Sequence, residues 1–449
     1  MTSWFFDRMR SFGEADAIVF DGVSHSYAEL ARLTEEWERF LDRNGIHAGQ
    51  VVALEGVSSV EACAGLLALI ERGAVVVPMT PLPAAKRAEF HEVAEVETVI
   101  TIDSAHWRRS VEITGREADH DLYGRLRADG VPGLVLFSSG TTGRSKASVL
   151  DFSKVLAKYG PPTRPRRTLG FLNLDHIGGI NTLLHTLSQG GALVTIDERT
   201  PDRVCATIAE QDIQILPTTP TFLNMLLISR AYERHDLSSL QLVTYGTEPM
   251  PEGTLQRLAR ALPGVRLKQT YGLSELGIMP TKSRDDGSLW VKLGGEGFSY
   301  RIDDGILWIR SDMAMLGYLN APAPFDEQGF FNTQDAVETD GDYVRILGRR
   351  SELINVAGEK VYPSEVENVL LELDYVADAV VSGRPSHVTG QVVKAVVKLT
   401  EPCTDPRVTA RRVREHCAQR LEAFKVPVVV EVTEADTHSD RFKKIRSAA

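Results

Sequence analysis

The sequence predicts a multidomain α/β protein that ends in a smaller α+β unit. Two successive stretches, before and after residue 130, alternate short apolar strands with helical patterns, and such strand–helix–strand repeats form parallel sheets. From about Gly287, short strands follow one another closely and are joined by turn residues, which predicts a small antiparallel or barrel-like unit. At 449 residues the chain is too long for one hydrophobic core, so about two to four domains are expected.

The elements of the first part follow from local patterns. A helix is expected to begin at Ser26 and to stop at Gly45, because apolar residues recur every three or four positions between them. An alanine- and leucine-rich helix then runs to Arg72, between two apolar strands. The remaining expected elements are strands at 51–54, 74–77, 133–137, 192–195 and 241–245, and helices around 181–187 and 203–211.

The following region has the texture of antiparallel structure. Strands are expected at 289–291, 300–302 and 306–310. Asp303-Asp304-Gly305 and Asp340-Gly341-Asp342 are typical of tight hairpins. After Gly348-Arg349-Arg350 the pattern changes to a tail of two strands and two helices, so we place a domain boundary near Arg350.

Composition excludes several classes of protein. Hydrophobic residues at 43% and charged residues at 25% are ordinary globular usage, which excludes wholesale disorder and a collagen-like fibre. The formal charge of −11, from 50 basic and 61 acidic side chains, lacks the electrostatic footprint of a general nucleic-acid binder. We therefore expect an enzyme rather than a nucleic-acid-binding protein.

Cysteine usage and hydropathy predict a cytoplasmic protein. Cys63, Cys205, Cys403 and Cys417 are far apart and form no C-x-x-C pair, so neither a disulfide framework nor a cysteine-rich zinc site is expected. The first ten residues lack the apolar core of a signal peptide. The most apolar stretch, 62–79, is interrupted by charged residues, so no membrane segment is expected.

A loop of small polar residues follows the strand at 133–137. Its sequence is Ser138-Ser139-Gly140-Thr141-Thr142-Gly143-Arg144-Ser145-Lys146. Glycine lets backbone N–H groups turn toward phosphate oxygens, while hydroxyls and an ammonium add further donors. The loop is not a Walker motif, because a serine precedes the lysine and an alanine follows it. By composition alone, a flexible surface turn is an equally good interpretation.

A second group of polar residues follows the strand pattern at 265–268. The run Gln269-Thr270-Tyr271-Gly272-Leu273-Ser274-Glu275 combines an aromatic ring, a glycine, a hydroxyl and a carboxylate at a strand end, as suits a ligand crevice in an α/β sheet. Glu275 can hold Mg²⁺ through its oxygens. The alternative is a helix N-terminus capped by Ser274 or Thr270.

Three later segments have simple alternatives when each is read alone. Thr333-Gln334-Asp335 and the run from Ile354 to Glu367 read as turns leading into an amphipathic helix. The basic tail Arg441-Phe442-Lys443-Lys444-Ile445-Arg446 reads as a solvated chain end.

Taken together and in order, these motifs resemble the AMP-forming adenylating superfamily, which includes acyl- and aryl-CoA synthetases, adenylation domains of nonribosomal peptide synthetases, and firefly luciferase. The likeness extends from Ser26 to the C-terminal lysines, with Ser145 and Ala147 departing from the family's phosphate loop. It implies a large N-terminal domain, residues 1–349, of two doubly wound αβ subdomains plus a small distorted β-barrel. A small mobile α+β C-terminal domain, residues 350–449, carrying the catalytic lysine is implied to follow.

The resemblance also implies nucleotide contacts. Tyr271 is expected against the adenine, Ser274 near the α-phosphate and Glu275 at Mg²⁺, while Asp335 and Arg349 match the family's ribose-binding residues. The expected ATP-binding set is completed by Ser138, Ser139, Gly140, Thr141, Thr142, Gly143, Lys146, Gly246, Thr247, Glu248 and Gly272. Gln334 stands where the family's T-G-D motif has glycine, and Thr247 stands at the second glycine of G-G-A-P.

In the tail, Lys443 falls at the family's catalytic lysine, with Lys444 as a rival. Ser351 occupies the hinge position, and Gly358 is expected in the tunnel that brings the thiol acceptor.

The expected acid-binding residues are Asp175, His176, Gly179, Gly246 and Gly272. His176 matches a histidine beside the substrate carboxylate in acyl- and aryl-CoA ligases. Asp175 falls near an aspartate that pairs with the substrate amine in amino-acid-activating relatives, which raises the hypothesis of an amino substrate. The alternative is that Asp175 caps a helix starting near Ile177.

The function implied is ATP-dependent activation of a small aryl or acyl acid as acyl-adenylate, with transfer to CoA. A carrier-protein phosphopantetheine or a non-thiol acceptor is the alternative within the family. A catalytically inactive nucleotide-binding regulator is the alternative of a different class, motivated by the departures at Ser145, Gln334, Ser351 and Phe442. ATP and Mg²⁺ are the expected cofactors, and neither nucleic acid nor membrane is an expected partner.

Overall fold

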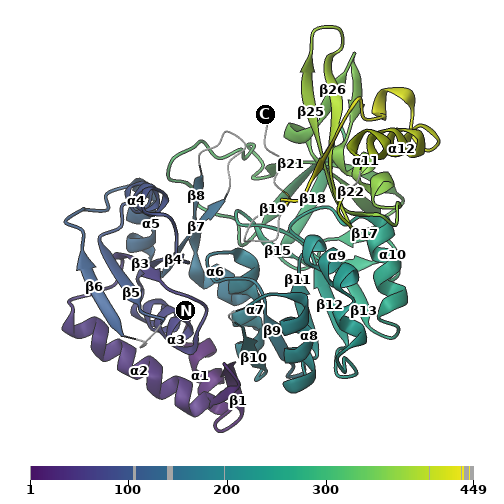
Figure 1. Ribbon diagram of the computed structural model, residues 1–449. Helices are drawn as coiled ribbons and strands as arrows, with labels where there is room; N and C mark the ends of the chain where they lie inside the picture. Colours follow the sequence, from purple (N-terminus) through teal and green to yellow (C-terminus); the bar gives the residue numbers. More distant parts are fainter. Residues whose placement is uncertain are drawn as a thin grey trace.

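The computed structural model places two seven-stranded mixed sheets side by side, with the C-terminal unit above the second of them (Figure 1). It describes residues 2–104, 108–138, 145–196, 198–403, 405–435, 437, 438 and 444. Over this part of the chain, no helix has the length and apolar character needed to cross a bilayer.

The first sheet has the order β20-β8-β7-β4-β3-β5-β6, and its four central strands, β7 to β5, run parallel. Helices α3 (Val60–Arg72), α4 (Ala84–Val93) and α5 (Asp121–Asp129) provide the crossovers. The strands are β20 (Gly317–Tyr318), β8 (Lys146–Asp151), β7 (Gly133–Ser138), β4 (Val75–Met79), β3 (Val51–Glu55), β5 (Thr98–Ile102) and β6 (Arg109–Ile113).

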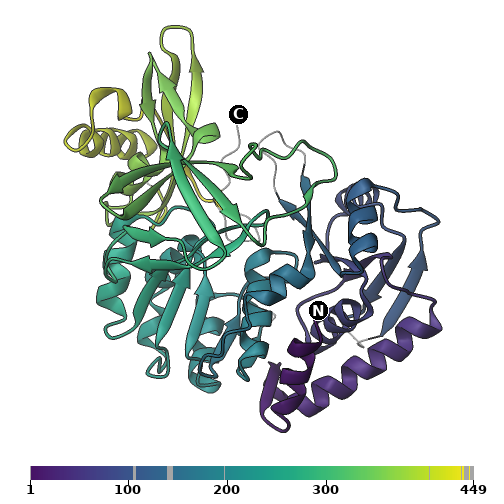
Figure 2. The same cartoon turned by 180° about the vertical axis from the view of Figure 1, so that it is seen from behind.

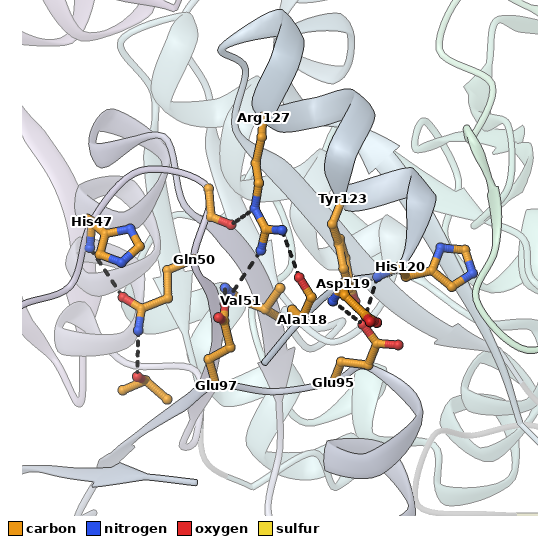
Figure 3. Close-up of polar contacts among 12 residues, drawn as sticks. His47, Gln50, Val51, Glu95, Glu97, Ala118, Asp119, His120, Tyr123 and Arg127 are labelled. Carbon is orange, nitrogen blue, oxygen red and sulfur yellow. Dashed lines mark hydrogen bonds and ion pairs between the residues drawn. The ribbon is translucent and has the colours of Figure 1, made fainter. Parts of the chain in front are cut away.

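The amino-terminal edge of this sheet is closed by a polar network (Figure 3). Arg127 on α5 donates through Nε to Gly49 O at 3.0 Å and through Nη1 to Ala118 O at 2.7 Å. Its guanidinium also lies 3.7 Å from Glu97, whose carboxylate accepts a 2.8 Å hydrogen bond from Val51 N. These contacts join the starts of β3 and β5 to α5, so the ligand site is expected at the opposite edge, where the parallel strands end.

The second sheet has the order β13-β12-β11-β9-β10-β1-β2. Its strands are β13 (Arg266–Gln269), β12 (Leu242–Tyr245), β11 (Ile215–Thr218), β9 (Arg167–Gly170), β10 (Ala192–Thr195), β1 (Asp16–Phe20) and β2 (Val23–Ser26). The accompanying helices are α1 (Ser3–Ser11), α2 (Tyr27–Arg43), α6 (Phe152–Ala157), α7 (Ile177–Ser188), α8 (Pro201–Glu210), α9 (Pro220–Ser229) and α10 (Glu252–Ala261).

The predicted helix between Ser26 and Gly45 is confirmed as α2. Ser26 Oγ accepts from Glu29 N at 3.1 Å, and the Glu29 carboxylate accepts from Ser26 N at 2.9 Å, which completes a capping box. Gly45 has φ +69°, a left-handed conformation that favours glycine where the helix ends. The periodic apolar side chains of this helix are buried in the main core.

A six-stranded antiparallel sheet stands where the sequence predicted antiparallel structure, between the second sheet and the C-terminal unit (Figure 2). Both predicted hairpins are confirmed by pairing of Asp303 with Ile306 and of Asp340 with Tyr343. The strand expected at 289–291 begins two residues later, at Val291. The strands in order are β16 (Thr281–Ser283), β17 (Val291–Leu293), β22 (Tyr343–Arg349), β21 (Phe331–Asp340), β19 (Ile306–Ser311) and β18 (Phe298–Asp303).

The C-terminal unit is a five-stranded sheet with two helices, so the expectation of only two strands was wrong. Three of its strands have only three to five residues, which is too short for a periodic pattern to stand out. The unit has its own hydrophobic core, drawn from residues 354–417. Its elements are β23 (Ile354–Val356), β24 (Glu359–Val361), α11 (Pro363–Leu370), β25 (Val376–Ser386), β26 (Gly390–Leu399), α12 (Pro406–Ala418) and β27 (Val429–Thr433).

Candidate active site

The predicted phosphate loop joins two paired strands at the carboxyl-terminal edge of the first sheet. Ser138, the last residue of β7, pairs with Lys146, the first residue of β8. Asn320 braces the base of this loop, because its Oδ1 accepts from Ala147 N at 3.1 Å and its Nδ2 donates to Ser145 O at 2.8 Å. The predicted contacts Ser139, Gly140, Thr141, Thr142 and Gly143 lie outside the described residues and stay predictions.

Residues 271–279 form a hairpin of β14 (Tyr271–Leu273) and β15 (Gly277–Met279). The alternative of a capped helix at this place was therefore wrong. Glu275 lies in the turn, between Ser274 and Leu276, and its backbone carbonyl accepts a 2.7 Å hydrogen bond from Met315 N. The turn holds the Glu275 side chain in a buried position next to the first sheet.

Tyr318 connects the phosphate loop to Glu275. Its hydroxyl donates to Glu275 Oε1 at 2.6 Å, and Lys146 Nζ lies 5.1 Å from the centroid of its ring. The ring therefore stands between an ammonium from β8 and a carboxylate from the β14–β15 turn. Neither Tyr318 nor Asn320 was predicted from the sequence, because each acts through partners that are distant along the chain.

The structure brings three of the predicted nucleotide-binding residues, Tyr271, Asp335 and Arg349, into a second cluster. The Tyr271 hydroxyl donates to the Asp335 carboxylate, and Arg349 Nε lies 3.5 Å from the other Asp335 oxygen. Asp335 and Arg349 are paired residues on β21 and β22. Burial, and then the Asp335 charge, raise the pKa of Tyr271 well above its usual range, so its hydroxyl keeps the proton that it donates.

Arg349 also interacts electrostatically with carboxylates of both clusters. Burial acts to lower the pKa of Arg349, but the Asp335 and Glu275 carboxylates outweigh burial, and the pKa is raised. Burial raises the pKa of Asp335 in spite of Arg349. Two buried carboxylates and two buried tyrosines thus meet a half-exposed arginine in one site, next to the phosphate loop.

Glu275 fits a Mg²⁺ ligand. Its side chain is buried, and the hydrogen bond that Tyr318 donates to Oε1 orients the carboxylate. The described residues contain no group of three or more His, Cys, Asp or Glu side chains that could cage a metal ion. One or two carboxylates are enough when Mg²⁺ is bound together with substrate phosphates and water.

Gly246 and Glu248 are both held by contacts with distant parts of the chain. A Cβ on Gly246 would lie 2.6 Å from Thr270 Oγ1, so only glycine fits there. Glu248 is half-buried, and its Oε1 accepts from Thr221 N at 2.7 Å, while its Oε2 accepts from Lys444 N at 3.4 Å. Because these contacts occupy the carboxylate, a nucleotide contact from residue 248 is expected to come from its backbone.

At the start of α7, the interpretation of Asp175 as the helix cap was wrong, because His176 is the cap. His176 Nδ1 accepts from Gly178 N at 3.0 Å, so a neutral ring carries its proton on Nε2. Asp175 Oδ2 accepts from Thr80 Oγ1 at 3.0 Å. Burial lowers the pKa of Arg199, and the nearby Asp175 charge opposes that change, so Asp175 lies within the field of a cation as well as beside Thr80. Its predicted contact with a substrate amine stays a prediction.

Gly179 and Gly272 are required by packing within the protein. A Cβ on Gly179 would lie 2.0 Å from Asn173 O, and one on Gly272 would lie 2.8 Å from Gly277 O. These glycines let α7 and the β14–β15 hairpin approach their neighbours closely. The predicted acceptor residue Gly358 is exposed with φ +96°, and the predicted hinge residue Ser351 is exposed in a short 3-10 turn.

The two candidate lysines can be distinguished by what holds Lys444. Its ammonium lies 3.1 Å from Glu367, 3.7 Å from Asp378 and 2.8 Å from Ala379 O, and its side chain is only 8% exposed. Lys444 is therefore committed to the core of the C-terminal unit. Lys443 lies outside the described residues, and these contacts of its neighbour favour it as the catalytic lysine.

At two motif positions, a residue other than glycine has a left-handed backbone. Gln334 has φ +62° and Thr247 has φ +75°, and glycine is the residue that the family motifs have at both. A side chain costs about 1–2 kcal/mol in this conformation. Gln334→Gly is therefore expected to raise the free energy of unfolding by about 0.5–1 kcal/mol, after allowance for the greater freedom of glycine in the unfolded chain.

Urea unfolding followed by tryptophan fluorescence measures this change. Glu338→Gly, at an exposed position with ordinary φ on the same strand, is the control and is expected to destabilise by a similar amount. A Gln334→Gly variant less stable than the parent protein would contradict the prediction.

Comparisons with known proteins agree with this geometry. The family model described as "AMP-binding enzyme" matches residues 5–319, and the one described as "AMP-binding enzyme C-terminal domain" matches residues 365–443. Indoleacetate–CoA ligase of Aromatoleum aromaticum (strain DSM 19018 / LMG 30748 / EbN1) is 27% identical over 463 residues, covering 92% of this chain and 90% of that protein. A long-chain-fatty-acid–CoA ligase of Mycobacterium tuberculosis (strain ATCC 25618 / H37Rv) is 26% identical over 458 residues, with the same coverage.

The fold matches a solved structure over nearly its whole length. The anthranilate CoA ligase AuaEII in complex with anthranoyl-AMP superposes with a TM-score of 0.84 at 19% identity, covering 98% of this chain and 95% of that chain. The motifs in order, the two buried clusters and the family models lead to one conclusion. The chain belongs to the family of AMP-binding enzymes.

Proposed function

We propose that this protein is an AMP-forming acid–thiol ligase that activates a small aryl or acyl acid and transfers it to CoA. The observation that carries the proposal is the meeting of Lys146, Tyr318 and Glu275 with the Tyr271–Asp335–Arg349 cluster. Together they offer cations for phosphates, a carboxylate for a divalent ion, and polar groups for a ribose. The relatives reported above carry ligase names for both aryl and long-chain acids, so they support the reaction class and leave the acid open.

In the first half-reaction, an oxygen of the substrate carboxylate forms a bond to the α-phosphorus of ATP, and the bond from that phosphorus to pyrophosphate breaks. Negative charge grows on the departing pyrophosphate and on the α-phosphate oxygens. Lys146 and Lys443 are placed by motif to stabilise that charge, and Ser274 to contact the α-phosphate. Mg²⁺ held by Glu275 would neutralise phosphate charge when bound.

Several residues orient the two substrates. Asp335 and Arg349 are proposed to hold the ribose hydroxyls, and the Tyr271 ring to lie against the adenine. His176 Nε2–H is proposed to donate to the acid's carboxylate, because Nδ1 is occupied by the helix cap. Asp175, Gly179, Gly246 and Gly272 are proposed to shape the acid site.

In the second half-reaction, the sulfur of CoA bonds to the acyl carbon, AMP leaves with the former C–O bond electrons, and the thiol proton is released. We propose that residues 350–449 rotate about Ser351 between the half-reactions, which brings Gly358 to the acyl site. The domain boundary near Arg350 is part of this proposal, and the separate core of the C-terminal unit supports it. A carrier-protein phosphopantetheine presents the same thiol and is the second acceptor to test.

Acid-dependent exchange of labelled pyrophosphate into ATP tests the first half-reaction, across a panel of aryl, aliphatic and amino acids. At least one acid is expected to support exchange, and AMP release is then expected to rise when CoA is added. Release only with a carrier protein or an amine would replace CoA as the acceptor. ATP binding without exchange for any acid would overturn the proposal in favour of a nucleotide-binding regulator.

A further inference from the structure

Lys158 bridges the two elements that carry the proposed acid-binding residues. It follows α6 directly, and its ammonium donates to Asn181 Oδ1 on α7 at 2.9 Å and to Ile278 O on β15 at 2.7 Å. Helix α7 begins next to His176, and Ile278 pairs with Gly272 across the hairpin. The ammonium therefore lies where the helix that starts at the acid-binding residues meets the hairpin of Gly272 and Glu275.

The charged group that acts on Lys158 is another lysine, Lys268. Among the described residues, no carboxylate forms an ion pair with its ammonium, and its titratable neighbours are Lys268 on β13 and His185 on α7, whose lowered pKa favours the neutral ring. Burial, and then Lys268, lower the pKa of Lys158 to about 8. A desolvated ammonium without a counter-ion is costly, so this cluster is poised to accept an anion.

The cluster is also within reach of solvent. His185 is exposed, yet burial by the surrounding protein, and then Lys158 and Lys268, lower its pKa. Lys158 and Asn181 are each half-buried, so neither polar group is fully enclosed by the protein. Gly178, Asn181 and His185 are spaced three and four residues apart and thus share one face of α7.

This face of α7 extends from His176 to the residues beside Lys158, over a short distance. At about 1.5 Å per residue, Asn181 lies about 6 Å along the helix from its first residue, and His185 about 12 Å. Asn181 Oδ1 accepts from both Lys158 and the Tyr159 hydroxyl, at 2.9 and 3.1 Å, which leaves the Asn181 amide Nδ2 as a further donor. Donors for a second anionic group thus lie one to two helical turns from the expected position of the reacting carboxylate.

Resting on the proposed function, we infer that the activated acid is a dicarboxylic acid whose second carboxylate binds Lys158, with Asn181 and His185 beside it. An acid with about four to six carbons between its carboxylates, or a benzene ring between them, spans the distance along α7. A positively charged group at that end of the acid would be repelled by Lys158 and Lys268. The alternative is that Lys158 serves only to tie α7 to β15.

The experiment compares matched acids in pyrophosphate exchange: adipate with hexanoate, and 4-carboxybenzoate with benzoate. The parent protein is expected to favour the diacid of at least one pair. Lys158→Met is expected to raise the KM for that diacid about 30-fold or more, with kcat and the kinetics of the monoacid nearly unchanged. Lys154→Met, at an exposed lysine one turn earlier on α6, is the control and is expected to leave the kinetics of both acids unchanged.

The pH dependence gives a readout that a merely structural tie would not move. Lys158 loses its charge as pH rises through about 8, so the KM for the diacid is expected to rise above that pH in the parent protein. The same KM is expected to lose this dependence in Lys158→Met. Lys268, His185 and Tyr159 are the titratable groups that face the ammonium, and Lys268→Met is the second variant if Lys158→Met does not fold.

Failure of this inference is distinct from failure of the proposed function. Exchange supported equally by monoacid and diacid, or a diacid preference unchanged in Lys158→Met, would overturn the inference and leave the ligase intact. If no acid supports exchange, calorimetric titration of diacid and monoacid into the ATP-bound protein tests the anion site directly. Equal binding of the two acids would then overturn it.

Discussion

Lys443→Ala is expected to reduce acid-dependent pyrophosphate exchange about 100-fold or more, with little change in thermal stability. The ammonium is proposed to stabilise charge that develops only in the transition state, and removal of one such donor typically costs about two to three orders of magnitude in rate. The measurement is the rate of pyrophosphate exchange with the best acid of the panel, at saturating ATP.

The neighbouring substitution, Lys444→Ala, is instead expected to lower the stability of the protein. It leaves Glu367, whose side chain is 4% exposed, without its cationic partner, and the loss of one member of a buried pair costs about 3–5 kcal/mol. The thermal midpoint of the C-terminal unit is therefore expected to fall by about 10 °C or more. Lys444→Met combined with Glu367→Gln, which removes both charges, is expected to recover part of that loss.

These two adjacent lysines control for each other. Both variants lose one positive charge from the same segment, so a general effect of charge would appear in both. If Lys444→Ala abolished exchange at normal stability while Lys443→Ala retained it, the assignment of the catalytic lysine would be wrong.

Glu275→Gln is expected to reduce exchange by about 100-fold or more, because the carboxylate is proposed to hold the ion that neutralises phosphate charge. Gln keeps the size of the side chain and an oxygen that can accept from Tyr318, so the fold is expected to persist. The loss is expected at every Mg²⁺ concentration that the assay tolerates.

Tyr318→Phe tests the hydrogen bond that orients the Glu275 carboxylate while leaving the carboxylate in place. It removes only the hydroxyl that donates to Glu275, and the loss of such an outer partner typically weakens metal affinity about 10- to 100-fold. The Mg²⁺ concentration for half-maximal exchange is therefore expected to rise by about that factor, with the maximal rate largely kept. Tyr343→Phe, a tyrosine in the antiparallel sheet, is the control. An unchanged Mg²⁺ dependence in Tyr318→Phe would argue against Glu275 as the metal ligand.

Much of the fold could be predicted where the signal is local. The limits of α2 follow from Ser26, Glu29 and Gly45, which act within a few residues of one another. The hairpin at Asp304 and Gly305 follows from left-handed backbone that these residues tolerate. The five-stranded sheet of the C-terminal unit could not be predicted in full, because strands such as β23 and β24 have three residues each and are defined by their partners.

The site shows the same division between local and distant information. Tyr271, Asp335 and Arg349 were each visible in a motif, and the structure brings them together. Asp175 and His176 are adjacent, and local pattern alone assigned the helix cap to the wrong one. Nothing in the sequence marked Tyr318, Asn320 or Lys158, because no motif surrounds them.

The sequence by itself determined that this acidic chain of 449 residues is a multidomain α/β protein with the motifs of adenylate-forming enzymes in order. Such motifs are readable because each consists of neighbouring residues whose backbone and capping preferences are local. Only the tertiary structure decided which side chains meet: Tyr318 with Glu275, 43 residues away, and Tyr271 with Asp335, 64 residues away. It also showed that Lys444 is held by Glu367 and that Lys158 lacks a described counter-ion, since contact and desolvation depend on distance in space and not on distance along the chain.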